Sequence, residues 1–316
     1  MNGYRSPVFS RAIYLANLVA QSLIIVTGVV VRLTDSGLGC PTWPQCVPGS
    51  YTPTPHQAQE WHKFIEFGNR LLTFILVIIA IAVVVTAIVN AVAERRQGRK
   101  VRRDVLVLAV VPILGTVAQA VLGGITVITG LNPYTVCAHL LVSMAIVAGS
   151  VALVVRSRVS PPRPLVVPPA VNLLAWSLVV VSAAVVFVGV IVTGSGPHSG
   201  DSTATRLPVD TRTVAWLHAD LVLLFLGLLI GLIVALAVVH APRAAKRTAV
   251  LLLLIALAQG TLGYTQYFLG VPELLVALHV TGATALWVTV LFIPPTLRVS
   301  AGTDPLRPKG IAAPSM

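Results

Sequence analysis

A repeated pair of histidines is the feature of this sequence most able to bind a cofactor. The 21-residue stretch from Gln119 to His139 returns, without a gap, between Gln259 and His279. Each copy is an apolar run with one Gln, a turn at a Gly, and a second apolar run that carries the His. Because an ionisable side chain inside an apolar helix is unfavourable, its recurrence at one position indicates a ligand or relay role.

A third histidine, His218, shares the depth of this pair. His139, His218 and His279 each fall about five to seven residues after the expected start of an apolar segment. Two neutral imidazoles that face each other across a four-helix bundle are the usual axial ligands of a b-type haem. We therefore expect His218 and His279, both in the second half of the chain, to bind one haem, and His139 to bind another.

The second ligand of the first-half haem has two candidates. Aligned on the leucine-rich run that follows it, His218 occupies the place of Asn69, whose amide is a much poorer iron ligand than imidazole. His62 lies two turns earlier, roughly 10 Å along the axis. Either His62 is the second ligand, or His139 holds the iron with a weak or open position opposite. Glu66 lies on the same helical face, inside the apolar run, and is a candidate acid/base.

Composition identifies the elements that must position these residues. Of 316 residues, 56% are hydrophobic and 10% charged, and the mean hydropathy is +0.90, which is typical of a multi-pass membrane protein. A helix needs about 20 apolar residues to cross the hydrocarbon layer. We expect an all-α protein with eight transmembrane helices near residues 12–31, 64–93, 105–128, 134–155, 171–193, 213–239, 248–269 and 273–297.

The positive charge orients these helices. Of the 22 Lys and Arg residues, 17 fall on the side that holds both termini, and only Arg32, Lys63, Arg70, Arg206 and Arg212 fall on the other. Because basic residues concentrate in cytoplasmic segments, both termini are predicted to be cytoplasmic. The net charge of +12 thus reflects how the protein is oriented in the cell membrane. It does not indicate a nucleic-acid partner. The haem sites then lie towards the outer face.

The expected outer loop contains two cysteines, Cys40 and Cys46. On the oxidising side of a membrane, a disulfide between them is the expected state. Whether the bond is a structural clip or a redox-active pair stays open, because strain and exposure decide it. The remaining cysteine, Cys137, is predicted to be a small packing residue.

The chain divides at a Pro- and Arg-rich linker. Residues 1–157 are expected to form a first four-helix half with the haem site of His139. Residues 158–170 form a cytoplasmic linker, 171–298 the second four-helix half with the haem b site, and 299–316 a cytoplasmic tail. The internal repeat predicts that the two halves are pseudo-symmetric.

Together these residues resemble the haem A synthase family, eight-helix membrane enzymes that convert haem O to haem A for cytochrome oxidase. The resemblance covers essentially the whole chain. It is carried by VVRLTDSGLGCPTWPQC at the end of the first helix, EFGNR in the second, both Gln-x-x-Leu-Gly repeats, and His139, His218 and His279.

The resemblance implies a haem b bound through His218 and His279 and a substrate haem O bound through His139. The family's helix-two ligand position is Asn69 here, and its glutamate is Glu66. It implies that the C8 methyl of haem O is hydroxylated twice, which gives the formyl group of haem A. Glu66 would act as acid/base or position water. The implied partners are haem O synthase (protohaem farnesyltransferase), the assembly of cytochrome oxidase, the lipid bilayer and an electron donor without a sequence signature.

An alternative function would use the same histidines to bind haem but would not oxygenate a substrate. A membrane dihaem cytochrome b would relay electrons from a quinol to a partner. A transporter is disfavoured, because both halves have four helices in one orientation and no broken helix pair marks a midplane site.

Overall fold

The computed structural model describes residues 7–158 and 164–298, and within these ranges the chain is helical. Eight helices are long and apolar enough to cross a membrane, which confirms the predicted all-α class and helix number. The bounds are α1 Pro7–Leu33, α2 His62–Arg96, α3 Arg103–Ile128, α4 Pro133–Arg158, α5 Pro169–Ser195, α6 Thr211–Val238, α7 Arg243–Phe268 and α8 Glu273–Leu291, followed by the short α9 Ile293–Thr296.

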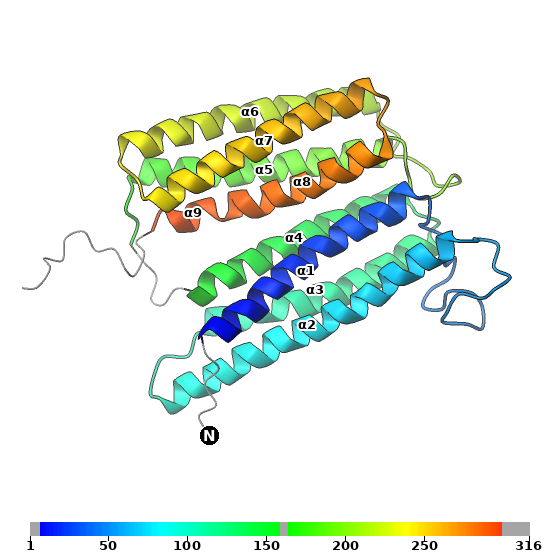
Figure 1. Ribbon diagram of the computed structural model, residues 1–316, viewed down its shortest axis with the longest axis horizontal. Coiled ribbons are helices and arrows are strands. Elements are labelled where there is room, and N and C mark those ends of the chain that lie inside the picture. Colours follow the sequence, from blue (N-terminus) through cyan, green and yellow to red (C-terminus); the bar gives the residue numbers. More distant parts are fainter. Residues whose placement is uncertain (1–6, 159–163, 299–316) are drawn as a thin grey trace, which may run out of the picture.

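The helices form two neighbouring groups (Figure 1). Helices α1–α4 make the first and α5–α9 the second, and α1 and α4 of the first group contact α5 and α8 of the second. The buried core includes both groups and the surface between them. There, the indole Nε1 of Trp287 on α8 donates to the carbonyl oxygen of Met144 on α4 at 2.9 Å. An indole N–H buried among apolar side chains needs such a partner.

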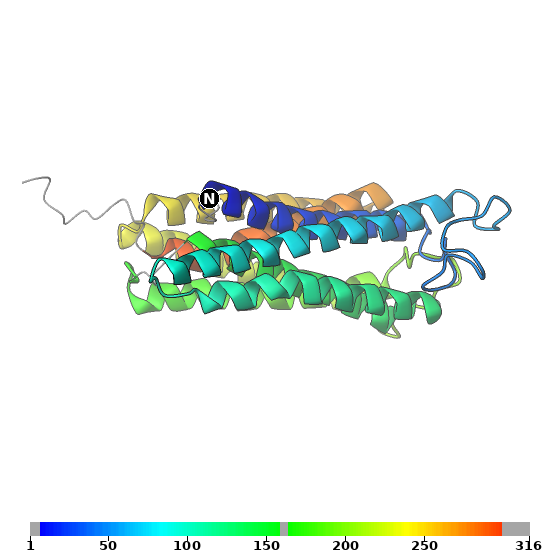
Figure 2. The same cartoon turned by 90° about the horizontal axis from the view of Figure 1, so that it is seen from below.

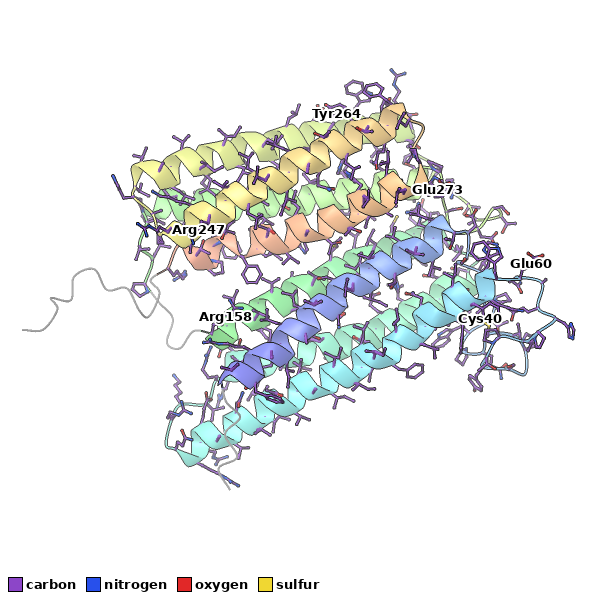
Figure 3. All side chains as sticks on the ribbon, in the orientation of Figure 1. Cys40, Glu60, Arg158, Arg247, Tyr264 and Glu273 are labelled. Carbon is purple, nitrogen blue, oxygen red and sulfur yellow. A yellow bond between two sulfur atoms is a disulfide. The ribbon has the colours of Figure 1, made fainter. Side chains whose placement is uncertain are left out.

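All helices run along the long axis of the molecule, and the loop after α1 projects from one end (Figure 2). Figure 3 shows Cys40, Glu60 and Glu273 at this loop end, with Arg158 and Arg247 at the opposite, basic end. The sides of the helices expose many large apolar side chains, among them Phe74, Ile78 and Phe268. Lipid is the environment that such a surface requires.

The turn that joins the two helices of each repeat has the same geometry in both copies. Gly130 has φ 61° and Gly270 has φ 75°, so each ends its helix in the left-handed region, where glycine is favoured. In both copies the next residue donates its N–H to a carbonyl five residues back, Leu131 to Thr126 at 2.8 Å and Val271 to Gln266 at 2.7 Å. The turns predicted at these glycines are confirmed.

The expected tail at 299–316 and part of the expected linker, 159–163, lie outside the described residues, as do residues 1–6. The remainder of the linker packs on the end of the second group. The Val166 N–H donates to the carbonyl oxygen of Leu297 at 3.0 Å, just after α9.

Candidate haem-binding sites

His218 and His279 face each other inside the second group. They lie seven and six residues after the first residues of α6 (Thr211) and α8 (Glu273), near the loop end. Their ring centroids are 6.5 Å apart and their planes meet at 65°. Asp210 fixes the start of α6, because its carboxylate accepts the Thr213 N–H at 2.8 Å.

The spacing of the two rings fits a shared metal ion. A metal–imidazole bond is about 2.0–2.1 Å and the ring centre lies about 1 Å beyond the nitrogen, so two rings ligating one ion are roughly 6 Å apart. The measured 6.5 Å is close to this value. Two T-shaped aromatic rings in direct contact can have a similar spacing. The chemistry of the donor set, two partly buried imidazoles, favours the metal.

Each of the three histidines packs against a glycine of a neighbouring helix. A methyl group added at Gly189 of α5 would lie 3.0 Å from Cε1 of His218. The corresponding distance is 3.3 Å from Gly263 to His279 and 3.4 Å from Gly123 to His139. These glycines therefore set how far each ring can lean towards its neighbouring helix.

The Nδ1 atoms of His139, His218 and His279 are buried and have no hydrogen-bond partner among the described residues. A buried polar nitrogen without a partner is unfavourable by about 1–3 kcal/mol. Three such rings at one depth are more readily explained as ligands than as packing residues.

In the first group, no ring contact between His139 and another histidine is found among the described residues. Asn69 Oδ1 accepts a hydrogen bond from the Thr27 hydroxyl of α1 at 2.8 Å. The ring of His62 stacks on Trp61, with centroids 3.9 Å apart. Among the described residues, a histidine–histidine ring contact is found only in the second group.

Glu66 is buried, and both of its carboxylate oxygens are engaged. Oε2 accepts the Cys40 N–H at 2.6 Å, and Oε1 accepts from Arg70 Nε at 3.0 Å and from a terminal guanidinium nitrogen at 2.6 Å. Arg70 also donates to the carbonyl oxygens of Cys40, Thr42 and Gln45. This ion pair therefore attaches the loop between α1 and α2 to α2.

The same loop carries the predicted Cys40–Cys46 disulfide, which is present with an S–S distance of 2.04 Å. Trp43 lies between the two cysteines and covers the first group. A methyl group added at Gly124 of α3 would come within 2.4 Å of the Trp43 ring, so this ring lies directly on the glycine. Gly123, which contacts His139, is the adjacent residue. The loop thus forms a cover beside His139.

The chain is similar in sequence to known proteins. The sequence profile of the COX15-CtaA family, described as cytochrome oxidase assembly protein, matches residues 11–291. This chain belongs to that family. It is 31% identical over 124 residues to the "Heme A synthase" of Geobacillus thermodenitrificans, an alignment covering 39% of this chain and 34% of that protein.

Two further relatives in the same family are also called "Heme A synthase". That of Lysinibacillus sphaericus (strain C3-41) is 31% identical over 146 residues, 45% of this chain and 44% of that protein. That of Geobacillus kaustophilus (strain HTA426) is 29% identical over 117 residues, 37% of this chain and 33% of that protein. The matched part of the chain thus spans about a third to under half of these curated relatives.

Sequence reasoning about this family member missed several residues that shape the sites. Gly189 and Trp43 were not singled out, and neither was the Thr27 partner of Asn69. A signal for Gly189 exists, because VGVIVTGSG near the end of α5 echoes TGVVVRLTDSG at the end of α1. Trp43 has no periodic signal, since it lies in an irregular loop.

Proposed function

We propose that this protein is a haem A synthase, an enzyme that oxidises the C8 methyl group of haem O to a formyl group by successive hydroxylations. The observation that carries the proposal is the pair His218 and His279, which face each other at 6.5 Å in a chain whose family profile matches residues 11–291. The relatives called "Heme A synthase" support the same function.

In the second half, His218 and His279 are the residues that would hold a haem b. Bound between two imidazoles, this group would supply electron transfer. Gly189 and Gly263 leave room for the two imidazole rings, because a larger side chain at either position would press on the neighbouring ring. This half therefore receives electrons from the donor.

In the first half, His139 holds the substrate haem O. Asn69 takes the place that an imidazole has in the second half, and its Oδ1 is already engaged by Thr27. The ring of His62 stacks on Trp61, and no ring contact between His62 and His139 is found among the described residues. Of the two candidate arrangements, these contacts favour His139 as the single strong ligand, with the opposite position open. The bound haem supplies the iron and the methyl group that is oxidised.

Glu66 is the acid/base or water-positioning group of this half. Its carboxylate lies beneath the disulfide loop and holds the Cys40 N–H. Because both oxygens have hydrogen bonds, its contacts favour positioning. It keeps Trp43 and the loop over the first group, which limits the access of bulk water to the site. To exchange a proton, Oε2 would have to release the Cys40 N–H.

The charge distribution supports a plasma-membrane location with both termini in the cytoplasm. The loop end, with the haem sites, then faces outward. Haem O synthase is the expected source of the substrate, and cytochrome oxidase the destination of the product. Haem O and haem A carry a long apolar chain, so both would enter and leave through the bilayer.

The test is expression with haem O synthase in a host without its own haem A synthase, followed by haem extraction and chromatography with mass detection. We expect haem A to accumulate with the wild-type protein and not with His218→Ala. Haem b bound without any haem A would instead identify a dihaem cytochrome b. A colourless wild-type protein would refute both functions.

A further inference from the structure

Polar side chains form a line inside the first group, where a membrane protein ordinarily places apolar ones. On α1, Ser10, Tyr14, Asn17 and Gln21 follow at spacings of four, three and four, which places them on one helical face. They are 7%, 2%, 0% and 4% exposed. The eleven-residue step from Ser10 to Gln21 corresponds to roughly 16 Å along the helix. The line thus crosses about half of the hydrocarbon layer.

Three of these four side chains form hydrogen bonds to another helix. The bonded pairs are Asn90 to Ser10 at 3.0 Å, Asn17 to Ser150 at 3.0 Å and Gln21 to Thr116 at 3.2 Å. Gln119 lies three residues after Thr116 on α3, and its Nε2 donates to the carbonyl oxygen of His139 at 2.8 Å. The line therefore starts near the basic end and reaches the candidate ligand of the substrate haem.

Much of the hydrogen-bonding capacity along this line is unused. Within the described residues of the first group, the buried side-chain atoms without a partner, besides His139 Nδ1, are Tyr14 Oη, Asn17 Oδ1, Thr86 Oγ1, Asn90 Oδ1 and Gln119 Oε1. Each unsatisfied buried group is unfavourable by about 1–3 kcal/mol. Tyr14 and Asn90 lie close enough to interact with each other, so the unpaired atoms of Asn17, Thr86 and Gln119 are the clearest cases. They indicate that small hydrogen-bonding molecules complete the network, and water is the molecule that buried polar groups ordinarily bind.

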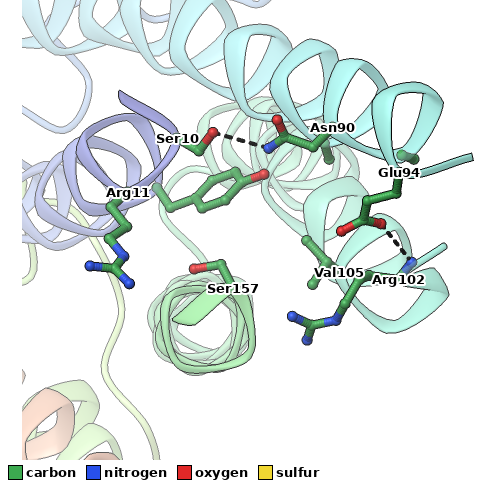
Figure 4. A pocket seen from close by; sticks show the side chains of 10 residues that line it. Ser10, Arg11, Asn90, Glu94, Arg102, Val105 and Ser157 are labelled. Carbon is green, nitrogen blue, oxygen red and sulfur yellow. Dashed lines mark hydrogen bonds between the residues drawn. The ribbon is translucent and has the colours of Figure 1, made fainter. Parts of the chain in front are cut away.

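A cavity opens at the start of the line (Figure 4). Its volume is about 110 Å³, which is room for several water molecules. Tyr14 and Asn90 line it, together with Ser10, Ser157 and the carboxylate of Glu94. The cavity lies between α1, α2, α3 and α4 at the basic end, which the positive-inside rule assigns to the cytoplasm.

The second group has no such line at the matching positions. The 140-residue shift of the repeat places Ser150 on Val290 and Thr116 on Ala256. All four side chains are buried, at 0%, 0%, 3% and 2% exposure. Aliphatic side chains can therefore fill these buried positions. Packing alone does not explain why the first group has polar side chains there.

Helices α1 and α5 show the same contrast. Aligning Gly28 with Gly189 places Asn17 on Leu178, and both are 0% exposed. The same alignment places Tyr14 (2% exposed) on Ala175 (0% exposed). At these two positions the burial is kept while the polarity is lost, whereas Gln21 falls on Ser182, which is itself polar and 0% exposed.

We propose that the first group encloses a hydrated polar pathway that leads from the cavity at the basic end to His139 and supplies protons to the reaction there. The use of these protons rests on the proposed function. When O2 hydroxylates a methyl group, one oxygen atom enters the new C–OH group. The other leaves as water after taking up an electron pair and two protons. The electrons come through the haem of the second half, and the protons come along the line.

The pathway is tested by comparing two single cysteines at equivalent buried positions, Ser150→Cys and Val290→Cys, each in a Cys137→Ala background. The other two cysteines are joined in the disulfide. Protein in lipid nanodiscs is exposed to Ag⁺, a thiol-reactive cation close to water in size, in chloride-free buffer. Thiols that remain reactive after unfolding are then counted by mass spectrometry.

Both positions are fully buried, so static burial predicts equal rates. A hydrated pathway predicts that Ser150→Cys reacts at least about tenfold faster, because thiol reactivity follows access to water. Equal rates would overturn the pathway. The pair Asn17→Cys and Leu178→Cys repeats the test should either first variant fail to fold.

The proton-supply role has its own test, the double variant Asn17→Leu with Ser150→Val. Because both partners of one hydrogen bond become apolar, this change leaves neither of them unpaired and should not lower the melting temperature. We expect unchanged haem b content and severalfold slower haem A formation. Unchanged haem A formation would refute proton delivery. Absence of haem A with the wild-type protein would instead refute the proposed function, and the cysteine comparison would still decide whether the pathway exists.

Discussion

Gly189→Ala should weaken haem b binding although it touches no iron. The added methyl would lie 3.0 Å from Cε1 and 3.3 Å from Nδ1 of His218, against ordinary contacts of 3.4–4 Å. The ring would have to move by about 0.4 Å to restore a 3.4 Å contact, whereas metal–ligand distances are kept within about 0.2 Å. Changes to the groups that orient a ligand cost about 10–100-fold in metal affinity. That is about 1.4–2.7 kcal/mol.

The control is Gly227→Ala, on the same helix as His218, where an added methyl meets nothing within 4 Å. By helix propensity alone, either substitution favours folding by about 0.5–1 kcal/mol. The assay is haem b per protein by pyridine haemochrome, followed through serial dilution in detergent, together with the haem midpoint potential. During dilution, we expect Gly189→Ala to lose its haem b at a protein concentration at least about tenfold higher than the concentration at which Gly227→Ala loses it. Identical haem retention and potential in the two variants would refute the assigned contact.

Three further predictions concern the first half. Asn69→His should supply a second imidazole opposite His139 and convert the first-half haem to a low-spin absorption spectrum; an unchanged spectrum would show that position 69 does not face the iron. Gly124→Ala should displace the Trp43 ring, since the added methyl would come within 2.4 Å of it, and a rise in the acrylamide quenching of tryptophan fluorescence, absent in Gly68→Ala, measures this. Glu66→Ala should destabilise the protein by about 3 kcal/mol, because it leaves a largely buried guanidinium without its counter-charge; thermal unfolding checks this, and an unaltered melting temperature would contradict it.

The number and type of helices could be predicted from sequence because they depend on the chain alone. A membrane helix satisfies its backbone hydrogen bonds internally, so length and hydropathy identify it without any knowledge of its neighbours. The positions of His139, His218 and His279 at one depth follow in the same way from helix rise. The turns at Gly130 and Gly270 were likewise readable from local signals.

Other features of the site depend on side chains that are distant in sequence. Thr27 and Asn69 lie 42 residues apart and Asn17 and Ser150 lie 133 apart, and neither pair has a local pattern. Glu66 was singled out from sequence, but its engagement with Arg70 and the Cys40 N–H becomes visible only when the loop folds back on α2.

The sequence by itself determined that this is an eight-helix membrane protein with an internal repeat and three histidines at one level, because hydropathy and periodicity are local properties. The tertiary structure alone decided which rings meet. His218 and His279 lie 6.5 Å apart, whereas the first half pairs Asn69 with Thr27. It also aligned the buried polar side chains of four helices into one line, since such contacts depend on how the helices pack.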